Sequence, residues 1–385
     1  MPRSTLGAEM GVHTLYGSPL SLYSGKPRSY LIKNGLPYRE ITPTTAHYEQ
    51  KVLPRARRRS VPTLETSDGV VIRDGAAIVD YFESRAGHPA TPESPRQRIL
   101  SRLLDVIGMV GLLRPAMHYR WSFPEENEAF LRAHFETMAP HGVAPDMYAD
   151  VAMKTMREWT SDFGVVFDSM AGVEARYAAL IQLLDRHFAR WPYLFGGRPS
   201  IADFSLIAPF YGHLGRDPKP LALMQREGVH LFRWVERMNR PEPDSGEFVD
   251  GGIVKPVGGF ASEDEVPESL EEVLRQLAID FVPETLAAAE HINAWIESQD
   301  ELPPGTIAKR GLGLAHFEVE GKLLAGLAQP YRFYLLNRVH EDFDAMPVKD
   351  QSRVEQLLER CNLLPILSAR LSRAIGREAN REVWL

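Results

Sequence analysis

The sequence predicts a chain of three parts: a small α/β domain over residues 13–84, an all-α domain over 95–240, and an additional α+β region over 265–385. Strand and helix patterns alternate in the first part, whereas helical periodicity alone fills the second. Stretches rich in Gly and Pro, at 86–95 and 241–267, separate the parts. At about 100–200 residues per domain, a chain of 385 residues has room for this arrangement.

The first part is predicted to alternate strands and helices. The expected elements are a strand at 13–16, a helix at 26–33, a strand at 38–41, strands at 61–64 and 70–72, and a helix at 76–83. Asn34 and Gly35 end the first helix, and Asp68-Gly69 supplies the tight turn between the later strands. The order suits a small sheet with helices on its faces.

Apolar residues at helical spacing fill the second part. We expect helices at 96–113, 149–159 and 173–188, and one that Ser200 and Asp203 cap reciprocally. In the third part, the expected elements are helices at 269–277 and 284–298, strands at 313–319 and 322–327 around a Glu320-Gly321 turn, and three further helices to about residue 377.

Composition excludes several classes of function. The chain has 44 basic and 51 acidic residues, which argues against nucleic acid as its main partner. Its single cysteine, Cys361, permits neither an intramolecular disulfide nor a zinc site of several thiolates. The histidines show no metal-ligand spacing, so we expect no metal. No apolar run reaches about 18 residues and no secretion signal is visible, so we expect a cytoplasmic protein without a membrane partner.

Four motifs, in order, carry a resemblance to a known family. They are Ser21-Leu22-Tyr23-Ser24-Gly25-Lys26-Pro27-Arg28, Asn34-Gly35-Leu36-Pro37-Tyr38, Val61-Pro62-Thr63-Leu64 followed by Ile72-Arg73-Asp74-Gly75-Ala76-Ala77-Ile78, and Phe195-Gly196-Gly197-Arg198-Pro199-Ser200-Ile201-Ala202-Asp203. Over 13–240 the chain resembles soluble glutathione transferases. The resemblance implies a thioredoxin-like N-terminal domain, an all-α C-terminal domain, glutathione as co-substrate in the cleft between them, and a homodimer. The region 265–385 has no counterpart in it.

The Val61-Pro62 bond is the first predicted glutathione contact. If the bond is cis, the N–H and C=O of Val61 face outward and can pair with the tripeptide as an added strand. The alternative is an ordinary trans proline at a strand edge. The resemblance favours the cis bond, and it adds Tyr23 and Ser60 to the predicted glutathione contacts.

Asp74 and Gly75 are expected at the N-terminus of the next helix, where unpaired amides and the helix dipole suit the γ-glutamyl carboxylate. The family pattern has Glu or Asp followed by Ser, whose hydroxyl also contacts that carboxylate. Gly75 departs from this pattern, and the missing hydrogen bond would cost about 1.5–3 kcal/mol of binding. Alternatively, Asp74 acts only as the helix N-cap.

A hydroxyl that donates to the glutathione sulfur would stabilise the reactive thiolate. Ser21 is the first candidate for this catalytic role, and Tyr16, at the end of the first strand, is the second. Since Pro27 fits best in a first helical turn, we expect the helix to begin near Ser24, with Ser24 as its N-cap. Cys361 lies far from this loop in the sequence.

Two functions remain open from the sequence. The first is an enzyme in which Ser21 activates glutathione for attack on a hydrophobic electrophile that contacts 96–119 and nearby aromatic residues. The second is a non-catalytic glutathione transferase-like scaffold that uses 265–385 to hold a partner or ligand. The run 55–59 either receives an anion or is a solvated loop, and Tyr331, in a predicted helix with Arg332 and Arg338, belongs either to a ligand face or to the core.

Overall fold

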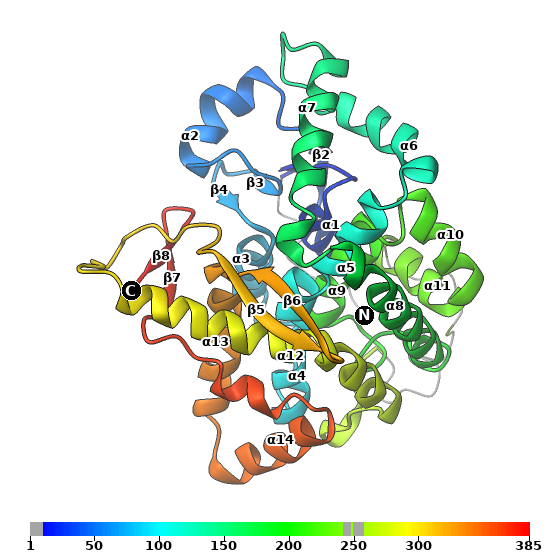
Figure 1. The fold of residues 1–385 in the computed structure, drawn as a ribbon, viewed down its shortest axis with the longest axis vertical. Helices are drawn as coiled ribbons and strands as arrows, with labels where there is room; N and C mark the ends of the chain where they lie inside the picture. The colour runs from blue at the N-terminus through cyan, green and yellow to red at the C-terminus, as the bar shows by residue number, and fades with distance from the viewer. Residues whose placement is uncertain (1–10, 242–247, 249–257) are drawn as a thin grey trace.

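The computed structural model of the chain describes residues 11–241, 248 and 258–385 (Figure 1). Most of the predicted linker 241–267 lies outside the described residues. The order of elements in the first part follows the prediction, since strand, helix and strand precede two strands and a helix. The elements are β1 (His13–Tyr16), α1 (Leu22–Lys33), β2 (Tyr38–Ile41), η2 (Tyr48–Val52), α2 (Leu53–Ala56), β3 (Thr63–Glu65), β4 (Val71–Arg73) and α3 (Gly75–Ala86).

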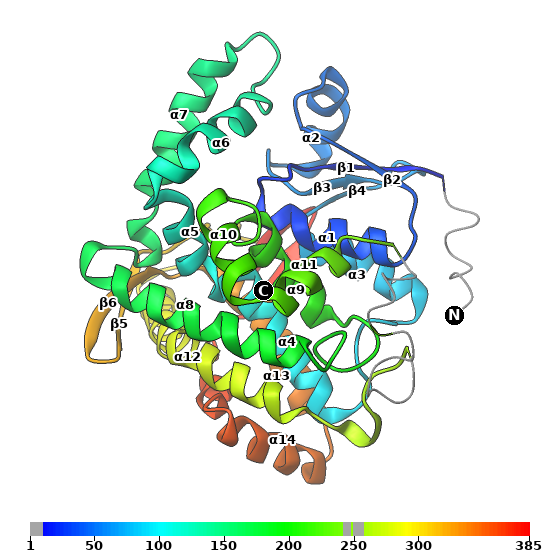
Figure 2. The same ribbon diagram turned by 90° about the vertical axis from the view of Figure 1, so that its right-hand side faces the viewer.

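The four strands form one sheet in the order β2-β1-β3-β4, with β1 and β2 parallel and the other pairs antiparallel. The register pairs Leu15 with Leu64, and Leu64 with Ile72, so these side chains share one face. They pack with α1 and α3, whereas Tyr16 on the opposite face packs with η2 and α2. Figure 2 shows α1 and α3 on one side of the strands and α2 on the other. The first part is therefore the thioredoxin-like α/β unit that the resemblance implies.

The second part is helical in the described residues. Its elements are α4 (Pro95–Val106), η3 (Ile107–Gly111), α5 (Leu113–Trp121), α6 (Pro124–Glu136), α7 (Pro145–Glu158), η4 (Ser161–Phe163), α8 (Phe167–Phe188), α9 (Ile201–Gly212), α10 (Pro218–Glu227) and α11 (Val229–Met238). The predicted capping box is confirmed, because Asp203 accepts the Ser200 N–H at 2.8 Å at the start of α9. The same carboxylate accepts the Leu194 N–H and the Trp234 Nε1–H, which fixes α9 to its surroundings.

The third part combines helices with two hairpins. Its elements are η5 (Ser262–Asp264), α12 (Glu268–Glu297), β5 (Leu314–Val319), β6 (Lys322–Leu327), α13 (Pro330–Asp344), α14 (Val348–Arg360), η6 (Leu364–Ser368), β7 (Ile375–Glu378) and β8 (Arg381–Trp384). The hairpin with its Glu320-Gly321 turn is confirmed. The two predicted helices at 269–298 are one helix, because residues such as Phe281 and Ile292 are buried on both sides of Pro283 and hold it together.

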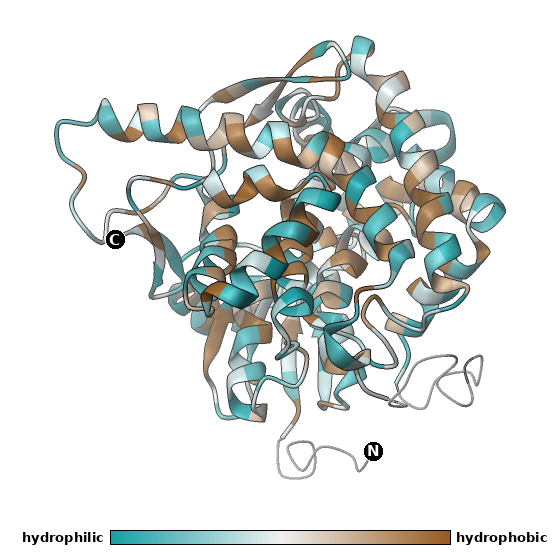
Figure 3. Cartoon of the chain, turned by 90° about the horizontal axis from the view of Figure 1, so that it is seen from below, coloured by the Kyte–Doolittle hydropathy of each residue, from teal (hydrophilic) through white to brown (hydrophobic). Residues whose placement is uncertain are grey.

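The third part packs closely on the other two. A continuous cluster of buried apolar side chains includes residues of all three, and most helices carry both hydrophobic and hydrophilic positions (Figure 3). Ion pairs join Arg338 to Asp80 of α3 and Asp342 to Arg102 of α4. This shared core crosses the boundaries predicted between the three parts. The boundaries of separate domains therefore remain a prediction.

The hairpin β7-β8 covers the edge of the first sheet. The side-chain oxygen of Asn380 accepts the Arg73 N–H at 3.0 Å, and its amide nitrogen donates to the Val71 C=O at 3.0 Å. One side chain thus satisfies alternate residues of β4, as a neighbouring strand would. Unpaired edge strands invite association with other chains, so this cover protects the sheet from such pairing.

A buried ion pair connects the first part to the second. Lys26 of α1 donates to Asp105 of α4 at 2.6 Å, and the Ser205 hydroxyl donates to the same oxygen at 2.8 Å. Burial alone would raise the pKa of Asp105, but the Lys26 ammonium and these hydrogen bonds lower it. This stabilisation is therefore present above the carboxyl group's unfolded pKa and is lost as the pH falls.

We expect Asp105→Asn to lower the free energy of unfolding by about 3–5 kcal/mol, because it leaves the Lys26 charge buried and uncompensated. Urea denaturation measures the loss. The matched control is Glu126→Gln, which breaks an exposed Lys219–Glu126 pair of the same 2.6 Å length and should cost less than about 1 kcal/mol. Equal losses in the two variants would contradict the interpretation.

Candidate functional site

Ser21 lies at the N-terminus of α1 and caps it. Its Oγ accepts the Ser24 N–H at 3.4 Å, so its own hydroxyl hydrogen is not used in that bond. The prediction that Ser24 is the N-cap is wrong, because the helix begins at Leu22 and the Ser24 Oγ accepts the Ser18 N–H instead. The helix tolerates Pro27 in its interior, where burial of the surrounding residues offsets the lost hydrogen bond.

The first turn of α1 lies against the N-terminus of α3. A Cβ added at Gly75 would lie 3.2 Å from the Tyr23 carbonyl oxygen and 3.4 Å from Cδ of Pro27. Because Pro27 has no N–H, that carbonyl also lacks its ordinary helical donor. A serine at position 75 would therefore require its neighbours to shift by a few tenths of an ångström. This explains in physical terms why the chain departs from the family pattern there.

The Val61-Pro62 peptide bond is cis, as predicted. Among the described residues, no hydrogen bond reaches the N–H or C=O of Val61. The Pro62 carbonyl accepts the Asp74 N–H at 3.1 Å, which joins this segment to the N-terminus of α3. Ser60 directly precedes Val61 in the sequence, and the Ser60 carbonyl accepts a hydrogen bond from the Thr63 hydroxyl.

Asp74 is the N-cap of α3 and has a second partner. One carboxylate oxygen accepts the Ala76 and Ala77 N–H groups, and the other accepts the Tyr331 hydroxyl at 2.7 Å. Its φ of 88° lies in a region that non-glycine residues rarely adopt and that is often found at functional sites. Burial and the Asp74 charge raise the pKa of Tyr331, so this phenol stays a donor.

Tyr16 lies on the other face of the sheet, with Tyr48 and Val52. Its hydroxyl donates to Glu65 at 3.2 Å, and burial together with Glu65 raises its pKa to about 12. The structure therefore does not place Tyr16 with Ser21. Tyr23 lies beside the site, because its carbonyl is next to Gly75. Burial raises the pKa of its hydroxyl, the Arg310 charge lowers it, and the Asp74 charge raises it.

The arginine run 55–59 divides into paired and unpaired side chains. Arg55 donates to Glu65 and to the Gly69 carbonyl, and Arg59 forms an ion pair with Glu49. Arg58 is exposed and has no hydrogen-bond or ion-pair partner among the described residues. Burial and the charges of Arg73 and Arg310 lower the pKa of Arg58, so these guanidinium groups lie near one another.

Two aromatic residues near the segment predicted to contact the second substrate, Trp121 and Trp159, differ in their surroundings. Trp121 is buried in a cluster with Leu20 and Met117, and is therefore core. Trp159, just after α7, is half-buried, and the Arg310 guanidinium lies 4.6 Å from its ring centroid. Cys361 is buried, and burial raises its pKa to about 12, which leaves its thiol unreactive.

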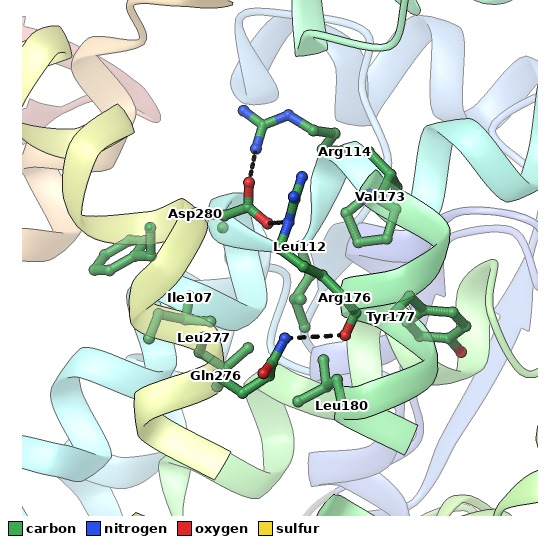
Figure 4. Close-up of a pocket in the computed structure, with 13 residues that line it drawn as sticks. Ile107, Leu112, Arg114, Val173, Arg176, Tyr177, Leu180, Gln276, Leu277 and Asp280 are labelled. Carbon is green, nitrogen blue, oxygen red and sulfur yellow. Dashed lines mark hydrogen bonds and ion pairs between the residues drawn. The ribbon is translucent and has the colours of Figure 1, made fainter. Parts of the chain in front are cut away.

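A pocket elsewhere in the molecule contains none of the predicted catalytic or glutathione-binding residues, although part of the segment 96–119, predicted to contact the second substrate, lines it. It lies between α8, α12 and the η3–α5 segment, where Arg114 and Arg176 both donate to Asp280 at 2.6 and 2.7 Å (Figure 4). Across residues 11–241 and 258–385, no group of three or more His, Cys, Asp or Glu side chains could hold a metal ion. Within the same described ranges, no helix is long and apolar enough to span a bilayer.

Sequence reasoning missed three features of this region. It left Tyr331 between a ligand face and the core, and it did not single out Arg310 or Asn380. Tyr331 and Asn380 reach residues of the first part from about 260 to 310 positions later in the chain. No local pattern encodes such contacts. The signal available was only that an α+β region followed two complete domains.

Comparison with known protein families gives a match for two segments of the chain. The family profile described as "Glutathione S-transferase, N-terminal domain" matches residues 15–91, and the one described as "Glutathione S-transferase, C-terminal domain" matches residues 167–237. A search of curated proteins finds no match.

Parts of the chain are similar to solved structures, among them the following three. A glutathione S-transferase of Methylobacterium radiotolerans in complex with glutathione sulfonate is 17% identical, with 67% of this chain and 100% of that chain covered and a TM-score of 0.36. The theta class enzyme of Xanthomonas axonopodis pv. citri with glutathione bound is 19% identical, with 63% and 97% covered and a TM-score of 0.36. The β-etherase LigF of a Sphingobium strain is 18% identical, with 62% and 99% covered and a TM-score of 0.40.

We expect the Tyr331–Asp74 contact to couple the third part to the first. In a double-mutant cycle of Tyr331→Phe and Asp74→Asn, urea denaturation should give a coupling energy of about 1–2 kcal/mol, because the bond involves a carboxylate. Asp74→Asn retains an oxygen for the helix cap. The same cycle with Tyr334→Phe, whose hydroxyl bonds to Arg338 instead, is the control and should give a smaller value. Two equal couplings would argue against a specific contact.

Proposed function

We propose that this chain, which matches glutathione S-transferase profiles over residues 15–91 and 167–237, binds glutathione and activates its thiol with Ser21. One observation carries the proposal. The N-terminus of α1, capped by Ser21, lies against the N-terminus of α3, capped by Asp74, which is in turn hydrogen-bonded to Pro62 beside the unpaired backbone of Val61. These are the groups that an extended tripeptide with a carboxylate and a thiol requires.

Ser21 is suited to stabilise a thiolate. Its Oγ already accepts a backbone N–H, so its hydroxyl hydrogen is free to donate to sulfur. The positive end of the α1 dipole adds to this effect. A thiol with a pKa of about 8.5 is mostly protonated at pH 7, and lowering its pKa by about 2 units requires about 2.7 kcal/mol. One charge-assisted hydrogen bond and a helix N-terminus supply a stabilisation of this size.

In the proposed reaction, the sulfur of the thiolate forms a bond to an electrophilic carbon of a hydrophobic substrate. The leaving group departs with the bonding electrons, and the thiol proton passes to solvent. No metal takes part in the proposal. We further propose a cytoplasmic homodimer, which would form through surface that the third part of the chain leaves uncovered.

The alternative is a scaffold that binds glutathione without turnover. The contact between Tyr331 and Asp74 favours it, because the third part of the chain directly touches the predicted glutathione-binding carboxylate. The enzyme remains the better-supported function, since Ser21 and the Val61 backbone keep unused hydrogen-bonding groups.

We expect Ser21→Gly to raise the thiol pKa of bound glutathione by about 1–2 units and to lower the rate of conjugation at pH 7 about 10- to 100-fold. Glycine is an adequate N-cap, so the fold should lose only a few tenths of a kcal/mol. The ultraviolet absorbance of the thiolate, followed against pH, gives the pKa. Unchanged pKa and turnover with intact glutathione binding would remove Ser21 from the mechanism and contradict the proposal.

We expect Gly75→Ser to bind glutathione about tenfold more tightly than Gly75→Ala, measured by calorimetry. Both variants add the same Cβ near the Tyr23 carbonyl, so only serine's hydroxyl separates them. Equal affinities would mean that no carboxylate of glutathione lies at the α3 N-terminus.

A further inference from the structure

Arginine side chains from four segments lie near one another. They come from the loop after α2, from β4, from the loop before β5 and from β7, and are Arg58, Arg73, Arg310 and Arg377; we call them the arginine cluster. Arg73 and Arg377 both pair with Glu382. Arg58 and Arg310 are exposed and have no ion-pair partner among the described residues.

Backbone contacts hold these segments together. The Ala308 N–H donates to the Glu382 carbonyl at 2.9 Å, which fixes the loop before β5 along β8. At the start of β8, Arg381 donates to the Arg57 carbonyl at 3.3 Å. Arg310 and Arg58 therefore lie in two loops, each of which is hydrogen-bonded to β8.

The charge of the cluster is not balanced by its neighbours. The acidic groups in contact with it or acting on it are Glu382 and Asp74. Glu382 is shared by Arg73 and Arg377, and Asp74 is engaged by Tyr331 and the α3 cap. Two guanidinium groups therefore remain available for an anion, and guanidinium groups bind carboxylates in a planar, two-point manner.

One face of α7 supplies aromatic and apolar surface to the same region. Tyr148, Thr155 and Trp159 are spaced seven and four residues apart, which places them on one side of the helix, and all three are half-buried. The Arg310 guanidinium stacks over the Trp159 ring at 4.6 Å. Burial raises the pKa of Tyr148 and the charge of Arg59 lowers it. Figure 1 shows α7 and α2 facing each other.

We propose that the second substrate is an aromatic electrophile that carries a carboxylate, with its ring against Trp159 and its carboxylate on Arg310 and Arg58. The inference rests on the proposed function and makes it specific, since it replaces a merely hydrophobic substrate with an anionic one. Tyr23 connects this surface with the glutathione site, since its carbonyl lies against the N-terminus of α3 and the Arg310 charge lowers the pKa of its hydroxyl.

The test compares two aryl chlorides, chlorodinitrobenzene and the corresponding chlorodinitrobenzoate. In both, the glutathione sulfur bonds to the ring carbon that carries chlorine, and chloride leaves with the bonding electrons. After each kcat/KM is divided by its uncatalysed rate constant, we expect the benzoate to be favoured about tenfold or more. Arg310→Gln and Arg58→Gln should each reduce this preference about tenfold.

Lys309→Gln is the matched control, because it removes one positive charge from an exposed side chain of the same loop without touching the cluster. It should keep the preference of the wild type. A wild-type preference near one, or equal effects of Lys309→Gln and Arg310→Gln, would overturn the inference. So would a loss of glutathione affinity in Arg58→Gln and Arg310→Gln with an unchanged preference, since the cluster would then hold glutathione.

Binding separates this inference from the proposed function. Dinitrobenzoate, which cannot be conjugated, should quench tryptophan fluorescence without glutathione, and Trp159→Phe should remove most of that signal. If the chain turns over neither chloride but binds dinitrobenzoate in an Arg310-dependent manner, the transferase proposal fails and the anion site stands. If glutathione binds and reacts but dinitrobenzoate does not bind, the anion site fails and the transferase stands.

Discussion

The close approach of α1 to α3 is the constraint on which the proposed site depends. A Cβ at position 75 would lie 3.2 Å from the Tyr23 carbonyl oxygen and 3.4 Å from Cδ of Pro27, so a glycine lets the two helix N-termini lie in contact without any shift. Each N-terminus carries unpaired amides and a positive dipole, and each is capped by a polar side chain that keeps further hydrogen-bonding capacity. The contact thus brings the Ser21 hydroxyl and the Asp74 carboxylate to neighbouring helix N-termini, and it also explains why the family's serine hydroxyl is missing.

The third part of the chain contributes contacts to that site. Asn380 closes the edge of the sheet and Tyr331 donates to Asp74, while Arg310 extends over Trp159, so three separate elements of the third part contact the first two parts. Buried apolar surface holds them there, because the core continues from α4 and α8 into α12 and α13. The extension is therefore a structural component of the candidate site, and the geometry of Asp74 depends on its folding.

The first two parts were predictable because their signals are local. Strand and helix periodicity gave the order of elements, and the Ser200–Asp203 spacing gave a capping box, since each signal spans only a few residues. Errors arose where packing overrides local preference: α1 begins before Ser24 although Pro27 lies inside it, and α12 continues through Pro283. Helices were predicted to about residue 377, but residues 375–384 form the β7-β8 hairpin. Its turn residues, Ala379 and Asn380, lack the Asn-Gly pattern of a two-residue turn, so no local signal predicted it.

The position of Tyr331 bears on the choice between enzyme and scaffold. Its hydroxyl occupies one oxygen of Asp74, and the α3 amides occupy the other, so this carboxylate is held in place before any ligand arrives. A preorganised charge lowers the cost of ordering a bound tripeptide. Ser21, by contrast, has a hydroxyl hydrogen with no partner in its cap, and a scaffold would have no use for it. Thiolate activation requires both groups. The fixed Asp74 carboxylate would bind glutathione, and the free Ser21 hydroxyl would donate to the charge that forms on sulfur.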